Sequence, residues 1–301
     1  MNNPIFIPKV NDSKITELSI HYPAIYVDAH TLLWRPGILQ DLQSSTDLLM
    51  ISPGTHFLPH ADAQPESYKK LPYYIPNSEV DRLYSDSTFR LDSLVKPCVQ
   101  FQEEHGAGII IAPYLYSDDT GSQISNTNFS IIADTIKNVQ SQRINKPIYA
   151  KALIASHHLT NVTTLDYLKS RYCDDFDELE GLIVMIDDLD DRAADESILR
   201  GLAHFVYEAS LDKKVYVQYL GGFGEVLCAV GASGLISGLA SNETFSMKDL
   251  QSEYEGPRGR GAAWTYIPQV FNHLNDNDVA KINYQCTCTG CNNSSPQDRG
   301  A

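Results

Sequence analysis

The chain has 301 residues, 43% hydrophobic and 20% charged, a composition ordinary for a globular protein with a substantial buried core. Its formal net charge of −15 at pH 7 argues against broad, nonspecific binding to nucleic acid, because phosphates repel a strongly negative protein. No window approaches the ~18 apolar residues of a membrane crossing, and the first residues lack the apolar core of a signal peptide. We therefore expect a cytoplasmic protein with no membrane partner.

Strand and helix patterns alternate along most of the chain. The first strong strand is the apolar run 24–29. A second run, 47–52, precedes a loop rich in proline, histidine and tyrosine that extends to about residue 76. Further strands are expected at 108–114, 147–155, 181–186, 215–220 and 235–238. Helices are expected at 38–44, at 79–105 in two pieces separated by Pro97, and at 129–143, 162–171, 195–210 (with Asp195 as N-cap) and 225–231.

The expected strands are continuous apolar runs, which indicates burial on both faces and therefore a parallel α/β sheet. Seven strands are evident, and Ile5–Ile7 or part of 262–268 could supply an eighth. A (β/α)8 TIM-like barrel over residues 1–261 fits this pattern best, and a doubly wound open sheet is the alternative. Residues 262–301 are expected to form a C-terminal zinc-binding segment packed on the barrel.

Polar residues follow several of the expected strands, and the active site of a barrel lies at these carboxyl ends. Carboxylates there suit proton transfer, cation binding or recognition of a heterocycle with N–H donors. Asp28 reads equally as a functional carboxylate and as an N-cap or turn residue, whereas the acidic run Asp187–Asp191 reads better as a solvated loop. The other polar residues at strand ends are His30, Ser52, His56, Tyr114, Asp118, Asp119, His157 and His158.

Two further features could take part in chemistry. Lys151 lies inside an expected strand, and a lysine that projects into a barrel is a candidate for Schiff-base chemistry. Pairing with an inward carboxylate, or a surface position, is the more common outcome for such a lysine. The glycine turn, Gly221, Gly222 and Gly224, could bring the backbone against an anion or another ligand, although a tight turn alone would also explain it.

A cysteine cluster near the end of the chain is the most specific local motif. Cys286, Cys288 and Cys291 have the spacing C-x-C-x-x-C, which lets three thiolates reach one tetrahedral ion, usually zinc. The alternative is three free cysteines in a polar tail. A fourth zinc ligand is not evident, because no histidine or cysteine follows Cys291 and the nearest upstream histidine is His273.

The strand end Tyr219-Leu220-Gly221-Gly222-Phe223-Gly224, a following helix, a last strand and the cysteine cluster together resemble the tRNA-guanine transglycosylase family. Members of this superfamily are zinc-containing (β/α)8 barrels that exchange a guanine in nucleic acid for a 7-deazaguanine, through a covalent aspartate–ribose intermediate. The resemblance implies that the three cysteines are zinc ligands and that Asp28 is the acid/base aspartate. It also implies that Asp187 reads the heterocycle and that Tyr219 and the glycine turn bind it. The expected partner is tRNA, DNA or a free purine-like base.

The chain departs from this family at the catalytic positions. Asp28 is followed by Ala-His-Thr instead of the remainder of the family's Asp-Ser-Gly-Gly-Phe-Gln motif. The last strand, Leu235–Gly238, carries no carboxylate that could serve as the family's nucleophile. Two alternative functions therefore stay open. One is a catalytically inactive barrel that acts as a binding or assembly subunit in a homo- or heterodimer, and the other is an unrelated barrel lyase that uses Lys151.

Overall fold

The computed structural model describes residues 3–10, 20–58, 66–191, 193–238 and 245–247, and the backbone of 264–267 and 272–275. The chain divides into two compact units, Met1–Ser252 and Glu253–Ala301. In the second unit, β9 (Trp264–Ile267) and β10 (Asn272–Asn275) form an antiparallel pair, a sheet separate from that of the first unit. The stretch 262–268 therefore does not supply the eighth strand.

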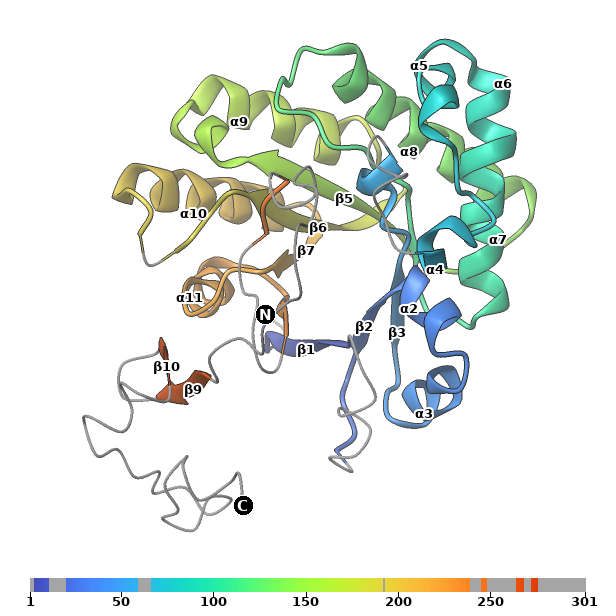
Figure 1. Ribbon diagram of the computed structural model, residues 1–301. Helices are drawn as coiled ribbons and strands as arrows, with labels where there is room; N and C mark the ends of the chain where they lie inside the picture. Colours follow the sequence, from blue (N-terminus) through green and yellow to red (C-terminus); the bar gives the residue numbers. More distant parts are fainter. Residues whose placement is uncertain are drawn as a thin grey trace. The chain divides into compact units, whose positions relative to one another are not determined.

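The first unit is built on eight parallel strands in the order β3-β2-β1-β8-β7-β6-β5-β4 (Figure 1). The strands are β1 (Ile5–Val10), β2 (Ile25–Asp28), β3 (Leu49–Ser52), β4 (Ile110–Ile111), β5 (Ile148–Ala155), β6 (Leu179–Asp187), β7 (Lys214–Gln218) and β8 (Gly234–Gly238). The two ends of this order also meet, because the Gly108 amide donates a 2.8 Å hydrogen bond to the Leu49 carbonyl. The sheet thus forms a nearly closed (β/α)8 barrel, which confirms the predicted barrel in place of the doubly wound open sheet; the zinc-binding part of the predicted fold class stays a prediction.

Two strands, β1 and β4, differ from what the sequence pattern predicts. Ile5–Ile7 belongs to β1, which lies between β2 and β8 and pairs with both, so this short run is the eighth strand. β4 is much shorter than the predicted strand 108–114. The side-chain amide of Gln102 explains this difference: it accepts a hydrogen bond from the Ile111 amide (2.8 Å) and donates one to the Ile111 carbonyl (2.9 Å), where a neighbouring strand would otherwise pair.

Helices alternate with these strands. They are α2 (Ala29–Trp34), α3 (Ile38–Ser44), α4 (Glu66–Lys69), α5 (Arg82–Ser85), α6 (Ser87–Arg90), α7 (Lys96–Glu104), α8 (Gln123–Ser141), α9 (Val162–Lys169), α10 (Glu196–Ser210) and α11 (Phe223–Val230), with short turns η2 (Asn77–Glu79), η3 (Leu91–Val95), η4 (Ser156–Thr160) and η5 (Ser170–Asp174). Pro97 does not separate two helices as predicted. It lies in the first turn of α7, where a missing N–H is tolerated, directly after the π-helical turn η3.

Alternation of side chains along the strands divides the core of the first unit in two. Ala150, Ala152 and Ile154 of β5 belong to the large cluster that packs the sheet against helices such as α8 and α10. In Figure 1, α8, α9 and α10 lie along the outer side of β5, β6 and β7. The intervening residues, which include Tyr149 and Lys151, therefore face the barrel interior, where the candidate site is found.

Candidate functional site

The barrel interior has an apolar floor beneath a polar mouth. The floor is one buried cluster that comprises Ile7, Ala24, Tyr26, Met50, Ile109, Ile111, Tyr149, Ile183, Tyr216 and Ile236. Nearer the carboxyl ends, the inward positions are polar: Lys9 on β1, Asp28 on β2, Ser52 on β3, Lys151 on β5, Asp187 on β6 and Gln218 on β7. Because successive inward positions are two residues apart, the change from apolar to polar occurs within one pleat on β1, β2, β3, β5 and β7. On β6 the apolar Met185 lies between Ile183 and Asp187.

An ion pair joins the first two strands of the chain. The Nζ atom of Lys9 lies 2.7 Å from Oδ2 of Asp28, and the two side chains are only 10% and 14% exposed. Lys9 Nζ also donates a hydrogen bond to the hydroxyl of Tyr219. Burial opposes charge on both groups, but their mutual attraction outweighs it, so the pKa of Asp28 is lowered to about 2 and the pKa of Lys9 is raised. Both groups are therefore charged at neutral pH.

Lys151 is buried near this ion pair and has neutral neighbours at its amine. It is 3% exposed, and its Nζ donates a 2.9 Å hydrogen bond to the Tyr26 hydroxyl. The amine also lies 5.4 Å from the centre of the Tyr26 ring and 4.8 Å from that of the Tyr114 ring. Burial lowers the pKa of Lys151 to about 7, with Asp28 acting to raise the pKa and Lys9 acting to lower it. A large fraction of this amine is thus neutral at physiological pH.

Aromatic side chains surround the mouth. His56 is 4% exposed and stacks on Tyr114, with ring centres 5.2 Å apart, while Phe245 approaches both His56 (5.4 Å) and Tyr219 (6.3 Å). Burial, followed by the charge of Lys151, holds the pKa of His56 well below its usual range, so the ring is neutral. Among the described residues, Nδ1 of His56 has no hydrogen-bond partner, and neither does the side-chain oxygen of Gln218. Unpaired buried polar atoms are costly and are typical of functional sites.

Asp187 has a structural part in this mouth. Its Oδ1 accepts a hydrogen bond from the Met247 amide (2.7 Å), and its Oδ2 accepts one from the Tyr116 hydroxyl (2.5 Å). The next residue, Asp188, has a left-handed backbone (φ 58°), and its amide donates to the Phe245 carbonyl at 2.8 Å. Asp187 thereby holds residues 245–247 at the end of β6. Its predicted recognition of a heterocycle stays a prediction.

The glycine turn after β7 has structural reasons for its residue types. Tyr219 and Gly221 both have left-handed backbones, with φ of 62° and 43°. Gly224 packs against β8, because a Cβ atom at this position would lie 2.5 Å from Cδ1 of Leu235. The amide of Phe223, at the start of α11, already donates a 2.9 Å hydrogen bond to Oδ2 of Asp191. An internal carboxylate thus occupies a donor that a ligand anion would use, and binding of a substrate by Tyr219, Gly221, Gly222 and Gly224 stays a prediction.

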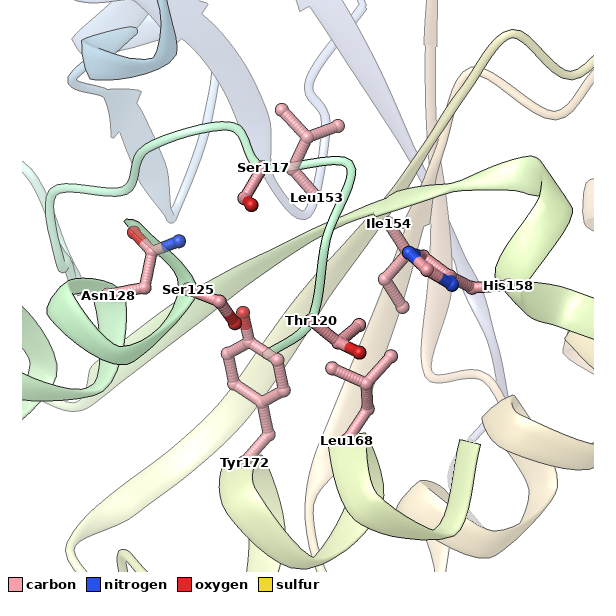
Figure 2. A pocket seen from close by; sticks show the side chains of 9 residues that line it. All are labelled: Ser117, Thr120, Ser125, Asn128, Leu153, Ile154, His158, Leu168 and Tyr172. Carbon is pink, nitrogen blue, oxygen red and sulfur yellow. The ribbon is translucent and has the colours of Figure 1, made fainter. Parts of the chain in front are cut away.

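Some of the polar residues that follow β4 and β5, including His158, line a separate crevice. Figure 2 shows this crevice, lined by Ser117, Thr120, Ser125, Asn128, Leu153, Ile154, His158, Leu168 and Tyr172. Its volume of about 20 Å³ is comparable to that of one water molecule, so it is too small for a substrate. Nε2 of His158 lies 2.7 Å from the Asp118 carbonyl, and this contact joins two loops. His158 therefore lines this crevice and joins two loops.

The predicted zinc ligands cannot be placed, because Cys286, Cys288 and Cys291 lie outside the described residues. In the described ranges no group of three or more histidine, cysteine, aspartate or glutamate side chains could hold a metal ion. In the same ranges no helix combines the length and the apolar character that a membrane crossing needs.

Sequence reasoning missed Lys9, Tyr26 and Gln218. The signal for Lys9 was present: it follows Ile7 by two residues in an apolar run, which places it on the same face of the strand. Comparison with known proteins adds no assignment, because no model of a known protein family matches the chain and no curated protein matches its sequence.

Proposed function

We propose that this protein is a barrel enzyme that forms an imine between Lys151 and a carbonyl substrate, as a lyase that breaks or forms a carbon–carbon bond. One observation carries the proposal: the contacts that the described residues make with the amine of the buried Lys151 come from the neutral Tyr26 and Tyr114, while the carboxylate of Asp28 is paired with Lys9.

The charges in the mouth explain why this amine is reactive. Among the described residues, Asp28 is the carboxylate that acts on both interior lysines, and it is paired with Lys9. The carboxylate of Asp187 is directed instead to the Tyr116 hydroxyl and the Met247 amide. If both lysines were protonated, the buried cluster would carry an uncompensated positive charge, which is costly. Leaving Lys151 neutral removes that charge. A neutral amine is the nucleophile that attacks carbonyl carbon.

The chemistry follows from these positions. The neutral Lys151 nitrogen attacks the carbonyl carbon to give a carbinolamine. Its hydroxyl takes up a proton from solvent and leaves as water, which gives a protonated imine. The Asp28 carboxylate stabilises the positive nitrogen electrostatically. In the cleavage direction, a β-hydroxyl loses its proton, the adjacent carbon–carbon bond breaks, and its electron pair moves toward the iminium nitrogen to form an enamine. His56 is our candidate to accept and return that proton, because it is neutral, its Nδ1 is unpaired among the described residues, and it stacks on Tyr114, which Lys151 also contacts.

Reductive trapping tests the proposal. Acetaldehyde, acetone and pyruvate are each incubated with the protein at pH 7 and sodium cyanoborohydride, and modified lysines are located by mass spectrometry. With a pKa near 7, about half of the Lys151 amine is neutral, about a thousandfold more than for an ordinary lysine. Preferential modification of Lys151 over the exposed Lys137 is expected, together with its loss in Lys151→Arg and its retention in Lys137→Arg. Modification of Lys137 without Lys151 by all three probes would refute the proposal.

The transglycosylase-like reaction is a second candidate, and one observation favours it. Asp28 is an ionised carboxylate inside the barrel mouth, as a group that attacks or orients a sugar-linked base must be. A pKa of about 2 argues against the proton-donating half of its predicted acid/base role, since such a group is rarely protonated. In this candidate Cys286, Cys288 and Cys291 would hold zinc, and tRNA, DNA or a free base would be the substrate. An inactive barrel that serves as a subunit in a dimer would keep the metal without the exchange.

Base exchange separates the two candidates. Zinc-loaded protein is incubated with labelled guanine and either bulk tRNA or DNA. Incorporation that is lost in Asp28→Asn and kept in Lys151→Arg would favour the transglycosylase over the lyase. If no guanine is incorporated and a carbonyl probe is trapped at Lys151, the lyase is the candidate that remains.

A further inference from the structure

We propose that Lys9 is a positioning residue that keeps Lys151 unprotonated by holding the Asp28 carboxylate away from it. The inference deepens the proposed function, on which its catalytic meaning rests. The arrangement of the two lysines about β2 carries it.

Lys9 and Lys151 both contact residues of β2, but they lie on different strands of the barrel. Lys9 is the register neighbour of Tyr26 on the adjacent β1, and its amine contacts Asp28, two residues further along β2. Lys151, on β5 across the barrel, reaches the hydroxyl of Tyr26. Tyr26 and Asp28 lie on the same face of β2, one pleat repeat or about 7 Å apart. Among the described residues, Asp28 is thus the carboxylate that acts on both amines, and its ion pair is with Lys9.

In the part of the chain that the structure describes, the other groups near Lys151 do not supply a substitute for Asp28. The charged or titratable groups that act on the cluster are Lys9, Tyr26, Asp28, His30, His56, Tyr114 and Tyr219. Burial raises the pKa values of Tyr26 and Tyr114 and lowers those of His30 and His56, so these four groups are neutral at pH 7.5. The protonation of Lys151 therefore depends on whether Asp28 is already paired.

This dependence predicts an effect that can be reversed by a second substitution. In Lys9→Met the carboxylate loses its partner, and Lys151 becomes the cation that neutralises it. Protonation then removes the nucleophile, although no atom of Lys151 has changed. In the double variant Lys9→Met/Asp28→Asn the carboxylate is absent as well, so Lys151 is again a buried amine without a counter-ion and returns to its neutral form.

The test measures the amine itself and needs no carbonyl substrate. Full-length wild type, Lys9→Met, Asp28→Asn and the double variant are labelled with trace acetic anhydride between pH 6 and 10, and acetylation of Lys151 is normalised to that of Lys137. Lys9→Met is expected to move the midpoint upward by more than about one pH unit, which lowers labelling of Lys151 at pH 7.5 by at least about threefold. The double variant is expected to return the midpoint to within about half a pH unit of the wild type and to restore labelling at pH 7.5.

Lys9→Gln, which keeps a polar group opposite Asp28, gives the same test if Lys9→Met does not fold, and is expected to shift the midpoint in the same direction. Unchanged labelling in both single Lys9 variants would overturn the inference, and so would a double variant that stays as unreactive as Lys9→Met. Failure of the proposed function looks different. In that case labelling follows the expected pattern, but no carbonyl probe is trapped at Lys151.

Discussion

Above pH 7, Lys151 should make the free energy of unfolding of the wild type rise with pH, and replacement of Lys151 by methionine should abolish this rise. The pKa of this lysine falls from 10.5 in the unfolded chain to about 7 in the folded protein. Between these values the unfolded state binds one more proton, so the free energy of unfolding rises with pH by about 1.4 kcal/mol per unit, and below pH 7 the contribution is constant. Lys151→Met lacks this contribution. From pH 7.5 to 9.5 the wild type should therefore gain about 2–3 kcal/mol relative to the variant.

Urea unfolding of both proteins at pH 7.5, 8.5 and 9.5 measures this difference. The loss of the hydrogen bond to Tyr26 and the change in packing add an offset that does not depend on pH, so the slope is the informative quantity. Lys137→Met replaces an exposed lysine of α8 and should run parallel to the wild type. Parallel curves for wild type and Lys151→Met would show that Lys151 is protonated in the folded state, and would refute the charge argument.

Three further changes test other parts of the structure. Gly224→Ala places a Cβ atom 2.5 Å from Leu235 and should lower the free energy of unfolding, measured in urea, by about 1–3 kcal/mol. Gly37→Ala is the control, because nothing lies within 4 Å of its added Cβ atom, and it should cost little. Equal costs for the two variants would contradict the packing of Gly224 against β8. Asp187→Ala removes the acceptor of two hydrogen bonds and should lower the free energy of unfolding by about 2–4 kcal/mol. A loss below about 0.5 kcal/mol would show that these bonds do not anchor residues 245–247. Purified protein should contain about one zinc ion by elemental analysis, lost with some thermal stability in Cys288→Ser; metal-free wild type would remove the zinc site.

The barrel was predictable because its signals are local. Alternating apolar strands and helices specify a parallel sheet, and the chain needs no distant contact to display them. The eighth strand was ambiguous because Ile5–Ile7 is short and its partners, β2 and β8, lie far along the sequence. The early end of β4 was not predictable, since it depends on the side chain of Gln102 in the preceding helix.

The site was only partly predictable because its chemistry depends on pairing. Asp28 and Lys151 were both candidates from their strand positions, but the properties of each depend on Lys9. Lys9 forms the ion pair with Asp28, so the amine of Lys151 contacts the neutral Tyr26 instead of this carboxylate. The anchoring part of Asp187 likewise depends on Tyr116 and on a segment 60 residues later in the chain. Strand position alone does not reveal these partners.

The measurement that tests the central claim most directly is the mass of the intact protein after incubation with pyruvate and borohydride, with Lys151→Arg beside the wild type. Imine formation followed by reduction predicts one added adduct on the wild type, located at Lys151, and none at that position in the variant. An unmodified Lys151 in folded wild-type protein, under conditions in which exposed lysines are labelled, would contradict the claim that this lysine is the reactive nucleophile of the barrel.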